Sequence, residues 1–152
     1  MSRLTIAIPT FRRPEDLKRA IGGVLKQVAE QAAREPSGGT VSDAEVLVID
    51  NDAQGSGRKA ALAAAADAGV PVRASEDEPA AGDVSVRYVV EERPGVAAVR
   101  NSALDETTER DLLIFIDDDE EPESGWLVAL VGLQASTGCQ AVAGPVIPVY
   151  EV

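Results

Sequence analysis

The sequence predicts an α/β domain in which a mostly parallel sheet lies between two layers of helices. Short apolar runs alternate with longer segments of helical periodicity, and a polar loop follows each of the main apolar runs. Strands that alternate with helices in this way favour parallel pairing through right-handed crossovers. A chain of 152 residues is long enough to bury one core, and no linker or internal repeat divides it. We therefore expect a single three-layer α/β/α domain over residues 1–152.

The first half of the chain contains two strand-helix units. An apolar run ends at Pro9, which cannot donate a hydrogen bond within a sheet. Pro14 is tolerated in the first turn of a helix, and apolar residues recur at helical spacing after it. An alanine-rich segment further on favours a second helix, which Gly69 ends. The expected elements are strands at residues 4–8 and 45–50 and helices at residues 14–34 and 58–68.

The second half repeats the alternation. The acidic stretch 74–83 contains Pro and Gly without any period, which favours a solvated loop. The run 112–116 is the most hydrophobic of the chain, and we expect a central strand buried on both faces. The other expected elements are a strand at 84–90, a helix at 95–107, a helix from near Pro122, and a last strand or pair of strands at 140–149.

Composition excludes several classes of function. There are 14 Lys and Arg against 26 Asp and Glu, so the net charge is −12, which disfavours nucleic acid as a partner. The chain has no histidine, so imidazole catalysis and His-ligated zinc are excluded. Its one cysteine, Cys139, forms no internal disulfide. No apolar run approaches the roughly 20 residues that span a bilayer. We expect a cytoplasmic protein, or one peripheral to a membrane.

Polar residues follow four of the predicted strands. Ligands of open α/β sheets bind outside the carboxyl ends of the strands, so we expect these residues to converge on one ligand site. In chain order they are Pro9, Thr10, Phe11 and Arg12; Asp50, Asn51 and Asp52; Arg93, Pro94 and Gly95; and Asp117, Asp118 and Asp119.

The acidic run 117–121 favours a metal site. Two carboxylates about 4 Å apart repel each other by roughly 4 kcal/mol at an effective dielectric of about 20, so a cluster of them calls for a cation. Carboxylates without His or Cys select a hard ion such as Mg²⁺ or Mn²⁺. The alternative is a solvated acidic turn at a helix N-terminus. In the same way, Asp50 has an alternative role as a turn residue, and Arg100 as a helix cap or surface ion pair.

Four motifs together resemble those of the family 2 glycosyltransferases, which are nucleotide-sugar enzymes of the GT-A fold. Each motif is weak by itself, but their order and spacing match across nearly the whole chain. They are Ile6–Arg13, Val48–Asp52, Gly95–Leu104 and Phe115–Glu120. The resemblance implies a Rossmann-like sheet of GT-A type, a nucleotide-diphospho-sugar donor, and Mn²⁺ or Mg²⁺ as cofactor.

The resemblance also implies roles for individual residues. The loop of Pro9, Thr10 and Phe11 would line the nucleobase and ribose, and Asp50 and Asn51 would hydrogen-bond to the base or ribose. Arg12 stands in the same nucleotide-sugar-binding loop, where the family often has Asn. The remaining implied residues are Arg100 near the pyrophosphate, Asp117 on the ribose or a metal-bound water, Asp118 in the donor site, and Asp119, with Asp117, on the metal.

The resemblance names no catalytic base in this chain. In the family, the acceptor site and the base follow the strand that corresponds to Ala143–Val146, so we expect the base beyond Val152 and a fold truncated at its C-terminus. We therefore expect the donor-binding half of a metal-assisted, inverting glycosyltransferase with an unknown acceptor. The alternative is a non-catalytic nucleotide-diphosphate-binding module or partner subunit. An exposed apolar edge predicts self-association or a partner chain.

Overall fold

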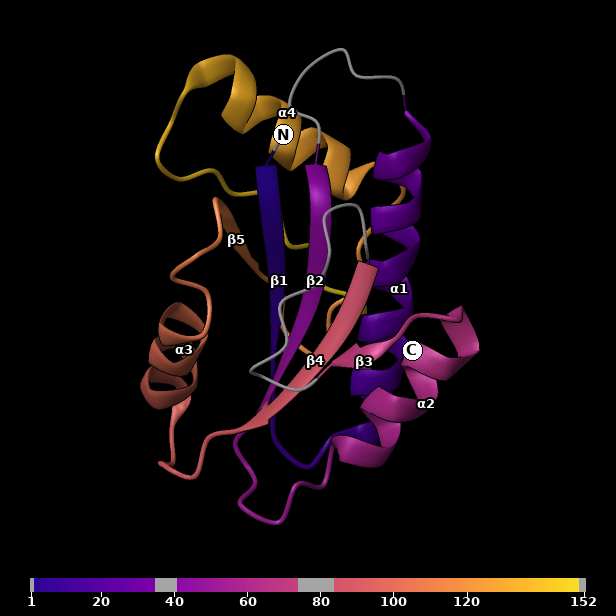
Figure 1. Cartoon of the computed structure of the whole chain (residues 1–152), viewed down its shortest axis with the longest axis vertical. Helices are drawn as coiled ribbons and strands as arrows, with labels where there is room; N and C mark the ends of the chain where they lie inside the picture. Colours follow the sequence, from indigo (N-terminus) through magenta and orange to yellow (C-terminus); the bar gives the residue numbers. More distant parts are fainter. Residues whose placement is uncertain (1, 35–40, 74–83, 151–152) are drawn as a thin grey trace.

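In residues 2–34, 41–73 and 84–150, which the computed structural model describes, five parallel strands form one sheet with helices on both faces (Figure 1). The strand order is β3-β4-β2-β1-β5. This confirms the predicted α/β fold. The elements are β1 (Ser2–Thr10), α1 (Pro14–Ala33), β2 (Val41–Asp50), α2 (Arg58–Ala68), β3 (Val72–Arg73), β4 (Val84–Val90), α3 (Val96–Asp105), β5 (Leu112–Phe115) and α4 (Trp126–Thr137).

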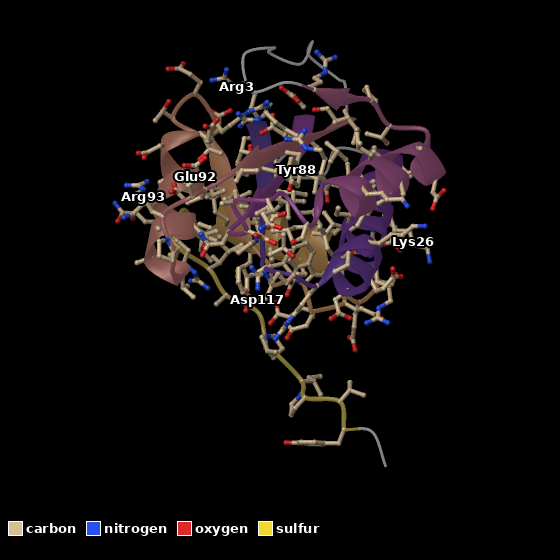
Figure 2. The ribbon with its side chains drawn as sticks, turned by 90° about the horizontal axis from the view of Figure 1, so that it is seen from below. Arg3, Lys26, Tyr88, Glu92, Arg93 and Asp117 are labelled. Atoms are coloured by element: carbon tan, nitrogen blue, oxygen red, sulfur yellow. The ribbon has the colours of Figure 1, made fainter. Side chains whose placement is uncertain are left out.

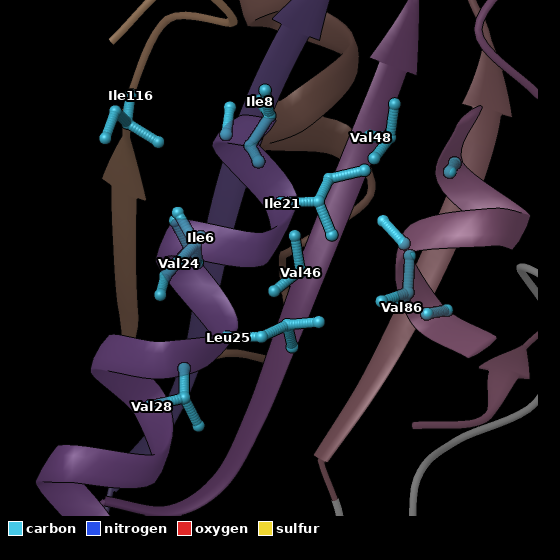
Figure 3. Close-up of a cluster of buried hydrophobic side chains, with 14 of the residues drawn as sticks. Ile6, Ile8, Ile21, Val24, Leu25, Val28, Val46, Val48, Val86 and Ile116 are labelled. Atoms are coloured by element: carbon cyan, nitrogen blue, oxygen red, sulfur yellow. The ribbon is translucent and has the colours of Figure 1, made fainter. Parts of the chain in front are cut away.

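The larger core lies between the sheet and helices α1, α2 and α4. Figure 3 shows the part of it in which side chains of α1 meet those of the strands. Successive side chains of a strand point to opposite faces, so alternate residues of β1 and β2 meet the apolar stripe of α1. Burying one such aliphatic side chain contributes about 1.5–3 kcal/mol. This core therefore fixes the carboxyl ends of β1 and β2, from which the functional loops leave. Its fully buried members include Leu4, Ile6, Ile8, Leu17, Ile21, Val24, Val46, Val48, Val86 and Leu127.

A smaller core lies on the opposite face, beneath α3. Val99 and Ala103 of the helix pack on Ala7, Leu47 and Ile49 of the sheet. Helix α3 is thus held against the middle strands by a few small or branched side chains. Its amino end follows the loop after β4, so this packing also positions that loop.

Charged side chains are buried on the same face as the smaller core. Glu45 is 2% exposed and accepts hydrogen bonds from Nε and Nη2 of Arg87 at 3.1 and 2.9 Å. Arg110 pairs with Asp43 at 2.6 Å and with Glu45 at 3.3 Å. Arg87 also donates to Glu106 at 2.6 Å. These five residues, the Glu45 network, join β2 and β4 to the segment that follows α3. The sequence analysis did not anticipate them.

Strand β5 lies at an edge of the sheet rather than at its centre. It pairs with β1, and its four residues are half-buried. The prediction of a central strand, buried on both faces, at residues 112–116 is therefore wrong. An apolar run shows that a strand contacts apolar side chains, but its place in the sheet depends on which distant strands it pairs with.

The prediction of a last strand or pair of strands at residues 140–149 is also wrong. Residues 141–150 form no helix or strand, and they lead away from the body of the molecule as the yellow segment in Figure 2. Pro145 and Pro148 lack the N–H that a sheet ladder needs. The exposed apolar side chains of this segment are Val146, Ile147, Val149 and Tyr150.

Smaller differences concern element boundaries. Helix α4 begins at Trp126 rather than near Pro122, because Glu30 of α1 accepts hydrogen bonds from Ser124 Oγ at 2.7 Å and from the Gly125 N–H at 2.9 Å. The chain before α4 is thereby docked on α1. The short strand β3 was not predicted, and the loop predicted at 74–83 lies outside the described residues. Among the helices described, none has the length and apolar character needed to cross a membrane.

Candidate functional site

The carboxyl ends of the strands bring four polar loops to one edge of the sheet. The register aligns Thr10 with Asp50, and Asp50 with Val90. Backbone hydrogen bonds continue past the strand ends, because the Asn51 N–H donates to the Thr10 carbonyl at 2.9 Å. Figure 2 looks onto this edge, where Tyr88, Glu92, Arg93 and Asp117 lie around the ends of the strands. The loops that the sequence analysis singled out thus share one side of the molecule.

Asp50 is fully buried at the end of β2, and its carboxylate already has three donors. Oδ1 accepts from the Asp52 N–H at 2.9 Å. Oδ2 accepts from the Gly57 N–H at 2.7 Å and from the Tyr88 hydroxyl at 2.6 Å. Burial and the bond to Asp50 raise the pKa of Tyr88, and the Arg58 guanidinium lies 4.7 Å from the centre of its ring. Asp50 therefore organises the turn between β2 and α2. Tyr88 is a neighbour that sequence reasoning missed.

Gly57 provides a test of this turn. A Cβ atom there would lie 2.9 Å from Leu17 Cδ2 and 3.0 Å from Asp50 Oδ2, both too close. We expect Gly57→Ala to lower the free energy of unfolding in urea by about 1–3 kcal/mol, the usual cost of overpacking. The control is Gly22→Ala in α1, where a Cβ meets nothing within 4 Å. That change should raise stability by about 0.5–1 kcal/mol. If Gly57→Ala and Gly22→Ala are equally stable, the space beside Gly57 is not as tightly filled by Leu17 and Asp50 as the structure shows.

Asn51 holds the loop between β4 and α3. Its Nδ2 donates to the carbonyls of Glu91 and Arg93 at 2.8 and 2.7 Å, and its Oδ1 accepts from the Gly95 N–H at 2.8 Å. Hydrogen bonds from the side chain and backbone of Arg93 lower the pKa of Glu91 to about 2. The β4-α3 loop is thus tied to β2, and Gly95 enters α3 with a φ of 113° that favours glycine.

The three aspartates after β5 occupy different environments. Asp118 is 7% exposed and accepts a hydrogen bond from Thr10 Oγ1 at 2.7 Å. Burial raises the pKa of the Asp118 carboxyl. The side chains of Asp117 and Asp119 are 55% and 54% exposed. Asp118 therefore anchors the acidic loop, Asp117–Glu121, to β1, while its two neighbours present their carboxylates to solvent.

Arginines lie beside both exposed aspartates. Arg100 of α3 places Nη2 3.9 Å from Asp117 Oδ1, with its guanidinium 5.3 Å from the centre of the Phe115 ring. Arg13 places Nη1 2.7 Å from Asp119 Oδ2. Neither partner is near in sequence. The contact of Arg100 with Asp117 is an exposed ion pair, which is the alternative that the sequence left open for Arg100, and its predicted place near a pyrophosphate stays a prediction. The contact of Arg13 with Asp119 was not predicted from the sequence.

The first loop presents an exposed aromatic side chain. Phe11 is 52% exposed, and the Arg12 guanidinium lies 4.9 Å from its ring centre. Arg12 Nε is 3.3 Å from Asp52 Oδ2, so this loop also contacts the loop after β2. Pro9 and Thr10, by contrast, still belong to β1.

The exposed carboxylates suit a hard divalent cation. Within the described part of the chain, no three Asp, Glu, His or Cys residues are grouped so that they could hold a metal ion by themselves. Mg²⁺ is commonly held by one or two carboxylates together with substrate phosphates and water. Asp117 and Asp119 supply such carboxylates at one edge of the sheet. Their donor chemistry therefore fits an ion that a phosphate-bearing ligand shares.

Comparison with known proteins identifies the family of this chain. The sequence model described as "Glycosyl transferase family 2" matches residues 5–151. The chain belongs to this family. A curated relative of this chain, the succinoglycan biosynthesis protein ExoM of Rhizobium meliloti (strain 1021), is 31% identical over 143 residues. The match covers 94% of this chain and 38% of the relative, so the chain spans well under half of that protein's length.

One solved structure is similar to this chain over nearly its whole length. The crystal structure of protein Rv1636 from Mycobacterium tuberculosis H37Rv is 16% identical, with coverage of 97% of this chain and 98% of that one. The TM-score is 0.39, and nothing about the site follows from it. The assignment to the glycosyltransferase family rests on the sequence match.

Proposed function

We propose that this chain forms the donor-binding half of an inverting glycosyltransferase that uses a nucleoside-diphosphate sugar. The observation that carries this proposal is the pair of exposed carboxylates, Asp117 and Asp119, held at the carboxyl edge of the sheet by the buried Asp118. Membership of the glycosyltransferase family supports it. In the reaction, an acceptor hydroxyl would lose its proton to a base and attack the anomeric carbon, while the bond from that carbon to the diphosphate oxygen breaks and the nucleoside diphosphate leaves.

Each part of the site has a task in this scheme. Asp119 and Asp117 would hold Mn²⁺ or Mg²⁺, which neutralises charge on the departing diphosphate. The planar guanidinium of Arg100 can bind two phosphate oxygens at once. Thr10 supports the acidic loop through its hydrogen bond to the buried Asp118.

The first two loops would receive the nucleoside. The exposed ring of Phe11 would offer an apolar surface to the nucleobase, with the Arg12 guanidinium beside the ring and Pro9 in the strand that leads into the loop. Asp50 and Asn51 are expected from the resemblance to hydrogen-bond to the base or ribose. The Asp50 carboxylate is fully buried with three donors, and Asn51 Oδ1 accepts from the Gly95 N–H, so their contribution to donor binding is to hold the neighbouring turns in place. We assign no catalytic base to the described residues.

Titration calorimetry tests the proposal. UDP and GDP are titrated into the protein with and without Mn²⁺. We expect one of them to bind in a metal-dependent way, and a sugar donor with that nucleotide should bind at the same site. Absence of metal-dependent heat with either nucleotide would count against donor binding. Donor turnover with simple acceptors then separates a transferase from a module that only binds.

A further inference from the structure

Arg12 and Arg13, in the loop that follows β1, extend in opposite directions along the carboxyl edge of the sheet. Strand β1 lies between β2 and β5, so its loop is flanked by the loops that follow both. Arg12 turns toward Asp52 after β2, and Arg13 turns toward Asp119 after β5. Arg12 has a φ of 55°, in the left-handed region. Side chains other than glycine rarely adopt this region, and such residues cluster at functional sites.

The acidic loop is only partly neutralised by the described residues. Arg13 contacts Asp119 at 2.7 Å and Asp118 at 3.6 Å, Arg100 lies 3.9 Å from Asp117, and Arg19 lies 3.8 Å from Glu121. Three guanidinium groups thus face five carboxylates. Of these contacts, the one between Arg13 and Asp119 is the shortest, and it engages a carboxylate that the proposed function assigns to the metal.

We propose that Arg13 is a tethered counter-ion of the acidic loop, which holds Asp119 in place until a divalent cation takes over that carboxylate. Its backbone carbonyl is bound by the Leu17 N–H at 2.9 Å, so the first turn of α1 anchors the arginine while its side chain stays half exposed. A guanidinium and a metal ion cannot share one carboxylate without repelling each other. Arg13 therefore competes with the cation for the carboxylate of Asp119.

This inference rests on the proposed function, because it concerns the same metal site. The variant Arg13→Gln keeps a polar side chain but removes the charge. We expect it to bind Mn²⁺ alone roughly two- to fivefold more tightly than the wild type, which is the size of an exposed ion pair. Calorimetry or the loss of free Mn²⁺ signal in electron paramagnetic resonance measures this affinity. Arg13→Lys should lie between the two.

Arg19→Gln is the matched control. It also removes one positive charge, here from the first part of α1. Within the described part of the chain, Arg19 pairs with Asp16 and with Glu121 of the same acidic loop, rather than with Asp119. We expect its Mn²⁺ affinity to stay close to that of the wild type. Equal tightening in both variants would show only a general effect of charge, and weaker binding in Arg13→Gln would show that Arg13 assists the metal. Either result overturns the inference.

Amide hydrogen exchange provides a readout that needs no metal. Without Mn²⁺, the peptide that covers residues 117–121 should exchange faster in Arg13→Gln than in the wild type or in Arg19→Gln. Unchanged exchange would show that Arg13 does not hold the acidic loop in place. If neither the wild type nor Arg13→Gln binds Mn²⁺, Arg13 does not compete with a cation for Asp119. Metal-dependent UDP binding by the wild type decides the proposed function separately. If UDP binds in this way but the three proteins share one Mn²⁺ affinity, only the inference about Arg13 fails.

Discussion

Replacing Arg87 by methionine is expected to lower the free energy of unfolding by about 3 kcal/mol. Breaking a buried ion pair by removal of one partner costs about 3–5 kcal/mol, because a charge is left without compensation in the interior. The side chains of Arg87 and Glu45 are 6% and 2% exposed, and Glu106 would also lose its partner. The effect should fall at the lower end of the range, because Arg110 remains 3.3 Å from Glu45.

Urea unfolding of three variants checks this prediction. Arg93→Met is the control, because Arg93 also pairs with a glutamate but is 69% exposed. It should change stability by less than about 0.5 kcal/mol. The double variant Glu45→Leu, Arg87→Met should regain part of the loss, since apolar replacement of a whole buried pair is often neutral. If Arg87→Met is no less stable than Arg93→Met, the Glu45 network does not stabilise the attachment of the segment after α3 to β2 and β4.

The second large effect is expected at Asp119. Asp119→Ala should weaken Mn²⁺-dependent UDP binding by more than about tenfold, since even a residue that only orients a metal ligand contributes that much. The fold should be unaffected, because the side chain is 54% exposed and the acidic loop stays anchored through Asp118 and Thr10. Titration calorimetry with and without Mn²⁺ measures the loss, and thermal unfolding confirms the fold.

Glu121→Ala is the matched control for Asp119→Ala. It removes one carboxylate from the same loop, and Glu121 is 74% exposed with Arg19 3.8 Å away. We expect its metal-dependent binding to remain within about twofold of the wild type, since an exposed charge of this kind contributes little. Equal losses in the two variants would mean that the loop attracts cations only through its total charge. If Asp119→Ala unfolds, the Asp119 side chain contributes to the stability of the fold rather than to metal binding.

Local patterns in the sequence were enough to predict most of the fold. Strand β4 and helix α2 have the predicted bounds, because the alternation of Val84–Val90 and the alanines of Arg58–Ala68 act through neighbours in the chain. The meeting of four loops at one edge also follows from parallel strands alone. What failed depended on distant partners, such as the edge position of β5 and the docking of Gly125 on Glu30.

The site divides in the same way. The sequence by itself determined that an acidic run follows an apolar strand, which favours a counter-charge or a solvated turn at that place. Only the tertiary structure decided that Asp118 is buried on Thr10 while Asp117 and Asp119 stay exposed, and that Arg13 faces Asp119. Thr10 and Arg13 are more than 100 residues from these partners. Burial and ion pairing depend on distances between residues in space. The order of the strands in the sheet sets these distances, and the local sequence pattern carries no information about that order.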